Sequence, residues 1–362
     1  MPPAEEVFTT PRPGPPGTAA PQRYGDSPVP WTCTASTQHW SGLLSRTGST
    51  DRPEHAGWPD VYLSSVAFEL GARVGIDELD DPAIRKSLTA LRDEGIQHCR
   101  LSTEPASRLA ALSSARSIAA AGSGEPTAAV YCAESPGTAS FCHDVWDFLV
   151  AMGRPTLPTV TVGGNACGNL PPALRIARNT ILTERGSSVL LVTTNKRGQA
   201  TRFIEDGQTV ISDGAASCLV SAHLMGSGFR VLGVSDAVRA DFPQSGSSLT
   251  RMSSVVKGVA RAVEGLSHVS GVGGQEYDLL ITGNYGTSVR YLFATAAGMD
   301  VNSVYAPQVA DIGHCFAGDL LISLAHAEAS GVLKHGARVL LLGTSPRSWT
   351  CAALEYVRAE TE

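Results

Sequence analysis

Two stretches of this sequence resemble each other and lie about 149 residues apart. The first reads Gly-Gly-Asn-Ala-Cys-Gly at residues 163–168 and is followed by a helix-like run and an apolar strand-like segment at 189–192. The second reads Ile-Gly-His-Cys-Phe-Ala at residues 312–317 and is followed by the same kind of run and by residues 339–342. Such a repeat predicts two similar halves packed together, with two helix N-termini facing one shared centre.

The segments around these motifs alternate between two patterns. Apolar, β-branched runs predict short buried strands, and the amphipathic runs between them predict helices. Gly137 and Thr138 match Gly286 and Thr287 at the same offset, so the duplication extends beyond the cysteine segment. The alternation predicts an α/β protein whose central sheets are covered on both faces.

Composition divides the chain into three parts and excludes several classes of function. Residues 1–57 are rich in Pro, Gly, Ser and Thr and predict a loosely docked extension, followed by two folded halves at 58–228 and 229–362. Hydrophobic residues make up 43%, enough for a large core, and the net charge of −6 gives no argument for nucleic-acid binding. No apolar run is long enough to predict a membrane partner, and the acidic, Pro-rich N-terminus predicts no signal peptide.

Eight cysteines are spread along the chain without a Cys-x-x-Cys pair, and no His-x-x-x-His pair occurs. This pattern predicts neither a disulfide framework nor a metal site. Free thiols are typical of a reducing compartment, so we expect a cytoplasmic protein.

Cys167 stands at a position suited to nucleophilic chemistry. Its neighbouring glycines allow a sharp strand-to-helix turn, and Pro171 and Pro172 suit the first turn of the helix that follows. A helix N-terminus favours the thiolate, and the Cys167 N–H can point at a developing oxyanion. The plainer interpretation of the turn alone is a packed cysteine.

The order and spacing of four motifs resemble the thiolase superfamily, and within it the ketoacyl-ACP synthase III-like condensing enzymes and acyltransferases. The motifs are Gly-Asn-Ala-Cys-Gly at 164–168, Ser-Asp-Gly-Ala-Ala at 212–216, Gly-His at 313–314 and Gly-Thr-Ser at 343–345. The resemblance covers residues 60–358. It implies two duplicated βαβαβαββ halves that form a five-layer αβαβα sandwich, and it implies a homodimer.

The resemblance also implies roles for single residues. Cys167 matches the cysteine that takes an acyl group from a thioester, carried by coenzyme A or by the phosphopantetheine arm of an acyl carrier protein. The backbone N–H groups of Cys167 and Ser345 would form the oxyanion hole. No permanently bound cofactor is implied; the thioester is a substrate, and a small molecule accepts the acyl group.

Three positions depart from the usual pattern. Asn284 stands where the family has a histidine, and His314 stands where it has an asparagine. Asp319 completes a Gly-His-x-x-x-x-Asp segment, as in a secondary-metabolite acyltransferase branch whose aspartate orients a histidine. His314 is expected to open a helix that runs to about residue 332. Residues five apart do not share a helical face, so the spacing alone leaves open whether Asp319 meets His314.

These departures leave three functions open. The first is an acyltransferase that moves an acyl group from Cys167 to a hydroxyl or amine in natural-product biosynthesis (polyketide or related), with His314 as base. The second is a decarboxylative Claisen condensing enzyme, in which Asn284 and His314 together hold an enolate. The third, of another class, is a non-catalytic partner subunit of a condensing-enzyme heterodimer. The aspartate-containing motif favours the first, while a helix-capping or solvent-facing His314 is the plainer alternative for that residue.

Overall fold

The computed structural model describes residues 59–122, 125–134, 140–184, 188–198, 200–242 and 248–359. All of these belong to one compact unit that spans residues 56–362. The expected extension at residues 1–57 lies outside the described residues, as do Gly137 and Thr138.

The first copy of the repeat consists of five strands, which form one sheet, and three helices that cover it. Its strands are β1 (Tyr62–Leu70), β4 (Ala128–Ala133), β5 (Thr159–Val162), β6 (Ser188–Asn195) and β9 (Gly214–Ser221). Its helices are α2 (Ala106–Ala121), α3 (Phe141–Ala151) and α4 (Leu170–Thr183). The strands lie in the order β5-β4-β6-β9-β1.

The second copy follows the same plan. Its strands are β10 (Ser227–Val238), β11 (Leu279–Thr282), β12 (Arg338–Thr344) and β13 (Ser348–Arg358), in the order β11-β12-β13-β10. Its helices are α5 (Ser248–Ser270), α6 (Thr287–Ala296) and α8 (Gly318–Ala329). A single parallel bridge between Leu280 and Val304 stands where β5 pairs with β4 in the first copy. The predicted duplication is therefore visible in the strand order itself; the boundary expected at 228/229 falls within β10.

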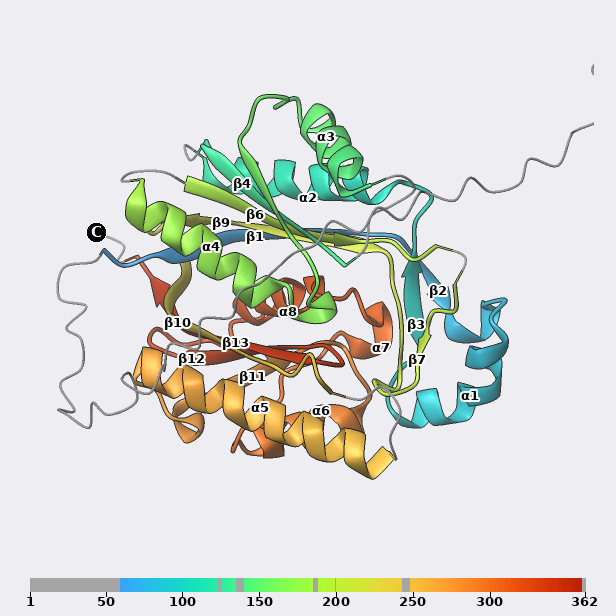
Figure 1. Cartoon of the computed structure of the whole chain (residues 1–362). Helices are drawn as coiled ribbons and strands as arrows, with labels where there is room; N and C mark the ends of the chain where they lie inside the picture. The colour runs from blue at the N-terminus through green and yellow to red at the C-terminus, as the bar shows by residue number, and fades with distance from the viewer. Residues whose placement is uncertain are drawn as a thin grey trace, which may run out of the picture. The chain divides into compact units, whose positions relative to one another are not determined.

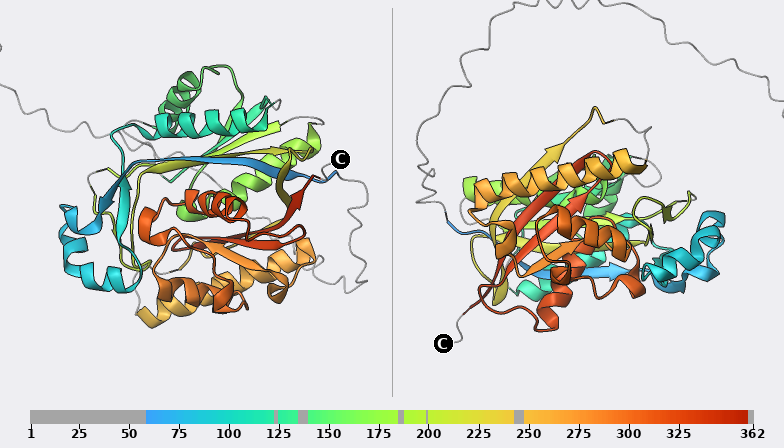
Figure 2. Two further views of the ribbon diagram at one scale, coloured as in Figure 1. Left: turned by 180° about the vertical axis from the view of Figure 1, so that it is seen from behind. Right: turned by 90° about the horizontal axis from the view of Figure 1, so that it is seen from below.

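Layers of helix and sheet alternate five deep (Figure 1). In that view α2 and α3 cover the first sheet, α4 and α8 lie between the sheets, and α5 and α6 cover the second sheet. The reverse view shows the same stacking (Figure 2). The predicted α/β class and five-layer αβαβα arrangement are confirmed. The two sheets join where Tyr62–Ser64 of β1 pair with Gly228–Arg230 of β10, so the nine strands of the two copies form one continuous sheet.

Helices on both faces explain why the central strands are apolar along their whole length. Every residue of β6 and β9 is buried, as are six of the seven in β12. Burial of a Val, Leu or Ile side chain contributes about 1.5–3 kcal/mol. The predicted buried strands are confirmed, and the layer between the sheets, where α4 and α8 pack, is the core that surrounds the site.

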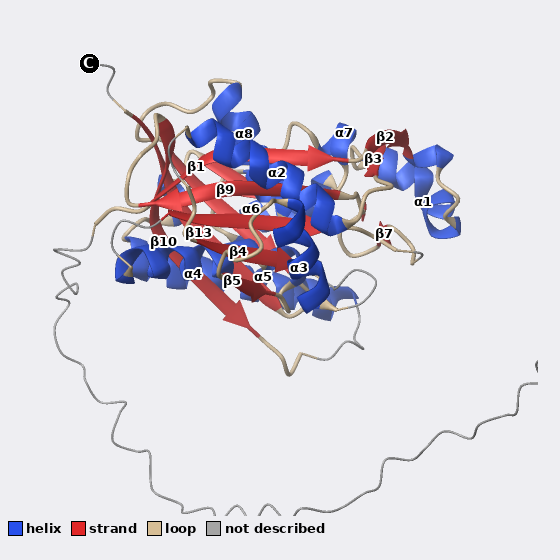
Figure 3. Cartoon of the chain, turned by 90° about the horizontal axis from the view of Figure 1, so that it is seen from above, coloured by secondary structure: helices blue, strands red, loops and turns tan. Residues whose placement is uncertain are grey.

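A small extension at one end of the sheets carries the remaining elements (Figure 3). It contains the antiparallel pair β2 (Ala72–Gly75) and β3 (His98–Leu101), helix α1 (Pro82–Asp93) and the two-residue strands β7 (Phe203–Ile204) and β8 (Thr209–Val210). The short helix α7 (Val309–Ile312) packs on β3 and leads into the second motif.

The two duplicated turns are built from unusual backbone. Ala166 has φ 46° and Phe316 has φ 52°, a left-handed conformation that L-residues adopt at a cost of about 1–2 kcal/mol. The first turn is a single 3₁₀ turn, Ala166–Gly168, that runs into α4, with its prolines in the first helical turn as predicted.

His314 does not open a helix, contrary to the prediction. Gly313 has φ 67° and ends α7. The His314 N–H then donates to the Val210 carbonyl oxygen at 2.9 Å, and its own carbonyl accepts from the Ser212 N–H at 2.9 Å. His314 is thus held in an extended bridge beside Ile211, and α8 begins at Gly318.

Candidate active site

The Cys167 turn packs directly against the second half of the molecule. A Cβ atom at Gly343 of β12 would lie 2.8 Å from the Gly168 Cα and 3.0 Å from the Cys167 carbonyl oxygen. The Thr350 hydroxyl of β13 donates to the Gly168 carbonyl oxygen at 2.9 Å. Gly343, which the sequence motif singled out, is therefore required for the close approach of backbone to backbone.

Three side chains from the two halves form one chain of contacts. The Cys167 Sγ lies 2.9 Å from His314 Nε2, and His314 Nδ1 lies 2.5 Å from Asp319 Oδ2. Because a carboxylate only accepts, Nδ1 carries the donated proton and Nε2 faces the sulfur. Cys167 is 9% exposed, whereas His314 and Asp319 are fully buried, so a molecule arriving from solvent meets the cysteine first.

Asp319 reaches His314 because the histidine lies outside the helix. Asp319 is in the first turn of α8, and its Oδ1 accepts from the Cys315 N–H at 2.8 Å. Its Oδ2 also accepts from the Asn284 N–H at 2.6 Å. The carboxylate thus binds N–H groups of the turn before α8 and of the segment after β11, and it also orients the histidine. A contact that the sequence spacing left open is present.

Asn284 supports this carboxylate and does not face the sulfur through its amide hydrogens. Its Nδ2 donates to the Gly313 carbonyl oxygen at 2.7 Å and to Asp319 Oδ1 at 3.2 Å. Exchanging the amide oxygen and nitrogen would set the oxygen against two acceptors, so these partners fix the orientation. The Asn284 Oδ1 is buried and has no hydrogen-bond partner among the described residues.

The charges in the site favour an imidazolium at His314. Burial by itself lowers the pKa of His314, but the nearby Cys167 and Asp319 outweigh it and raise the pKa to about 10. A positively charged His314 between a sulfur and a carboxylate is the arrangement that keeps a cysteine reactive.

Tyr285 and Thr344 lie at the site although sequence reasoning did not assign either a role. The Tyr285 ring centroid is 4.8 Å from that of His314, and its hydroxyl lies 3.0 Å from Thr344 Oγ1. Each directly follows a residue that the motifs marked, Asn284 or Gly343, and this adjacency could have indicated that they lie at the site.

The Ser345 N–H is not available as an oxyanion donor in this conformation, contrary to the prediction. It donates to the Ser348 carbonyl oxygen at 2.8 Å and closes the turn between β12 and β13. The predicted turn lies one to two residues later than expected, because Gly343 and Thr344 still belong to β12. The Cys167 N–H has no hydrogen-bond partner among the described residues.

Other features of the described residues do not form a second site with this chemistry. No group of three or more His, Cys, Asp and Glu side chains there is placed to hold a metal ion. Cys99, Cys132, Cys218 and Cys351 are buried in the core, as predicted. Within the described part of the chain, no helix has the length and apolar character needed to cross a bilayer.

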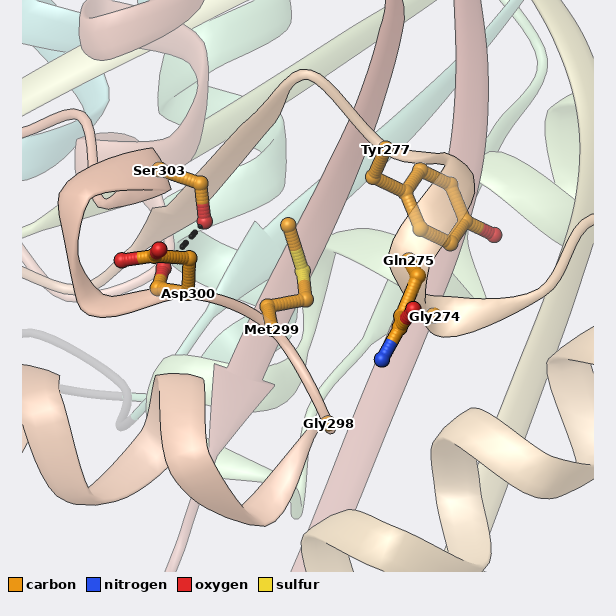
Figure 4. Close-up of a pocket in the computed structure, with 7 residues that line it drawn as sticks. All are labelled: Gly274, Gln275, Tyr277, Gly298, Met299, Asp300 and Ser303. Atoms are coloured by element: carbon orange, nitrogen blue, oxygen red, sulfur yellow. Dashed lines mark hydrogen bonds between the residues drawn. The ribbon is translucent and has the colours of Figure 1, made fainter.

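A pocket of about 510 Å³ lies between the start of β11 and the loop after α6. Figure 4 shows it, with the Ser303 hydroxyl donating to the Asp300 carbonyl oxygen at 2.6 Å on one side. Its lining contains neither a cysteine nor a histidine: Gly274, Gln275, Tyr277, Gly298, Met299, Asp300 and Ser303. The pocket is separate from the Cys167 contacts and supplies them with no group.

Comparison with known proteins agrees with the fold. The solved structure of the acyltransferase ChlB3 matches with a TM-score of 0.70 and 16% identity, over 83% of this chain and 98% of that one. The 3-oxoacyl-(acyl carrier protein) synthase III of Pseudomonas aeruginosa, FabH, matches with a TM-score of 0.66 and 17% identity, over 83% and 100%. OleA of Xanthomonas campestris matches with a TM-score of 0.67 and 16% identity, over 82% and 99%.

The fold is that of 3-oxoacyl-acyl-carrier-protein synthase III. The thiolase-like fold that the motifs implied is therefore confirmed. No protein-family sequence model matches the chain, and no curated protein sequence matches it. At 16–17% identity the likeness shows the fold alone, and the chemistry depends on the residues of this chain.

Proposed function

We propose that this protein is an acyltransferase that loads an acyl group from a coenzyme A or acyl-carrier-protein thioester onto Cys167. It then passes the group to a hydroxyl or amine of an acceptor in natural-product biosynthesis. The observation that supports this most strongly is the buried contact chain from Cys167 through His314 to Asp319. A nucleophile, a base and a group that orients the base are the three parts that covalent acyl transfer needs.

In the first step the Cys167 sulfur attacks the thioester carbonyl carbon. A new carbon–sulfur bond forms and the bond to the pantetheine sulfur breaks. The departing thiolate takes the proton from His314 Nε2, which lies 2.9 Å from the Cys167 Sγ. The products are an acyl-Cys167 thioester, a free pantetheine thiol and a neutral His314, so atoms and charges balance.

In the second step His314 acts as a base. Once Cys167 is acylated, its sulfur carries no charge, and one of the two influences that raise the pKa of His314 is lost. The neutral Nε2 accepts the proton of the acceptor's O–H or N–H as the oxygen or nitrogen attacks the acyl carbon. The Cys167 sulfur leaves as a thiolate beside the imidazolium, which restores the starting state.

Asn284 favours transfer to a protic acceptor over decarboxylative condensation. Condensation needs two neutral donors to hold the enolate. Both amide hydrogens of Asn284 are already bound to Gly313 and Asp319, and what it leaves unpaired is an acceptor, Oδ1. An unpaired buried acceptor costs about 1–3 kcal/mol, which a donated O–H or N–H from a substrate would relieve.

We also propose that the chain works as a homodimer without a permanently bound cofactor. The strand β5 is at the edge of the sheet, with Val160 51% exposed, and the neighbouring α3 exposes Trp146 at 58% and Val150 at 68%. An unpaired apolar edge is a ready surface for pairing with a second copy. The molar mass in solution tests this: twice the chain mass supports it, and a monomer at micromolar concentration overturns it.

The decisive experiment for the reaction is intact-protein mass spectrometry after incubation with a panel of acyl-coenzyme A and acyl-carrier-protein donors. We expect a mass increase equal to one acyl group, which disappears in Cys167→Ala and persists in Cys142→Ala. Cys142 is an exposed free cysteine and so controls for non-specific acylation.

Two outcomes would overturn the proposal. If no donor in the panel acylates Cys167, the chain is better explained as a non-catalytic partner subunit. If the acylated protein instead releases carbon dioxide from a malonyl thioester and extends the acyl chain, it is a condensing enzyme.

A further inference from the structure

Tyr285 lies against the contact chain, yet neither proposed step has used it. It follows Asn284 and is 5% exposed. Its ring lies 4.8 Å from the His314 ring and meets Phe293 edge-on at 5.6 Å. Its hydroxyl lies 3.0 Å from the Thr344 Oγ1, and Thr344 directly follows the glycine that touches the Cys167 turn. The phenol therefore lies between the His314 ring and the end of β12, the strand that packs against the Cys167 turn.

Two glycines make the room that the Tyr285 ring occupies. A Cβ atom at Gly283 would lie 2.6 Å from the ring Cε2 and 3.0 Å from the His314 Cε1. A Cβ atom at Gly207 would lie 2.8 Å from the ring Cδ1. Because real Cβ atoms do not approach so closely, any side chain at either position would displace the ring. The ring is fixed on two sides, and its hydroxyl end is the part that faces Thr344.

The phenol is a neutral donor near pH 7. Burial raises the pKa of Tyr285 well above its ordinary value, and the adjacent Cys167 raises it further by charge and by hydrogen bonding. The Thr344 hydroxyl, which lowers it, is the smaller influence and can donate its own hydrogen to the phenol oxygen. The phenol hydrogen then remains available for a substrate oxygen.

We propose that the Tyr285 hydroxyl is the second oxyanion donor of the site, beside the Cys167 N–H and in the place expected for the Ser345 N–H. This inference rests on the acyl transfer proposed above. When the sulfur attacks, the carbonyl π pair moves onto oxygen, which is two bonds from the sulfur, and the Tyr285 hydroxyl, held beside Thr344 with its ring against His314, donates to it. The phenol keeps its proton and donates a hydrogen bond; when the pantetheine thiolate leaves, the pair returns to the carbonyl.

The test distinguishes an effect on oxyanion stabilisation from an effect on the reactivity of the Cys167 sulfur. Acylation by acyl-coenzyme A passes through an oxyanion, whereas alkylation of the same sulfur by iodoacetamide is a direct displacement at carbon and forms none. We expect Tyr285→Phe to lower the rate of Cys167 acylation about 100-fold and to leave the rate of Cys167 alkylation nearly unchanged. Both rates are measured by intact-protein mass spectrometry on the full chain.

Tyr131→Phe is the matched control. Tyr131 is also fully buried, but it packs against Phe148 on the outer face of the first sheet, and its hydroxyl has no partner among the described residues. We expect it to change neither rate. Thr344→Val, which removes the hydroxyl bonded to the phenol, is the second variant; we expect a smaller fall in the acylation rate alone.

Each result decides the matter. A selective loss of acylation in Tyr285→Phe or in Thr344→Val supports the inference. Acylation at the wild-type rate, or an equal loss of acylation and alkylation in both variants, overturns it and leaves Tyr285 a packing residue. If wild-type Cys167 is alkylated by iodoacetamide but acylated by no donor, the proposed function itself fails, and the role of Tyr285 fails with it.

Discussion

The two duplicated turns begin the same kind of helix in different ways. In the first copy α4 starts with Pro171 and Pro172, which have no N–H to satisfy. In the second copy α8 starts with Asp319, a buried carboxylate that accepts from the Cys315 N–H and the Asn284 N–H. The first copy thus has prolines in its first helical turn, and the second copy has a negative charge there that binds N–H groups outside the helix.

This difference explains how the chemistry is divided between the halves. The carboxylate in the first turn of α8 is also the charge that orients His314 and raises its pKa. The turn before α4 has no charged residue, so no carboxylate competes with the Cys167 sulfur for the N–H groups there. A symmetric framework has therefore become an asymmetric site through the first residues of two helices.

Removing the charge of Asp319 should have the largest effect on the reaction. We expect Asp319→Asn to lower the rate of acyl transfer by about 10²–10⁴-fold, because the His314 tautomer and charge are no longer fixed. Steady-state turnover measures it. Asp311→Asn is the control, since Asp311 of α7 pairs with Arg73 of β2 and Arg100 of β3 and not with His314 or Cys167. Equal losses in the two variants would contradict the assignment.

The pH dependence of stability sharpens the comparison. The folded pKa of His314 is raised from 6.5 to about 10, so its contribution to stability is complete below about pH 6.5 and is lost as the pH rises toward 10. The free energy of unfolding should fall across this window by at most about 1.4 kcal/mol per pH unit from this group.

The variant Cys167→Ala should shift the pH range over which the free energy of unfolding falls. It removes the larger of the two nearby charges that raise the pKa of His314, so the fall in stability should finish at a lower pH than in the wild type. Denaturant unfolding at a series of pH values measures both curves, and curves of the same shape would count against the coupling of the two turns.

A smaller effect tests how tightly the two halves approach each other. We expect Gly343→Ala to destabilise the protein by about 1–3 kcal/mol, because its Cβ atom would press on the Gly168 and Cys167 backbone. Gly198→Ala is the control, since a Cβ atom there meets nothing within 4 Å. Thermal unfolding measures both, and equal melting temperatures would show that the turn can move aside.

The repeat, the alternation of strands and helices, and the turn at Cys167 could be predicted because each depends on local pattern. The start of α8 could not, since it depends on the positive φ of Gly313 and Phe316 and on the bridge from His314 to Ile211. The engaged Ser345 N–H likewise depends on the exact end of a hairpin. Tyr285 was missed because its place is set by the space at Gly283 and Gly207, one of them far along the chain.

The sulfur and its imidazole partner are separated by 147 residues and come from opposite copies of the repeat. Neither copy alone carries a complete set of reactive groups. A nascent or partly assembled chain therefore holds a cysteine without its base, and reactivity toward thioesters would report that both copies have docked.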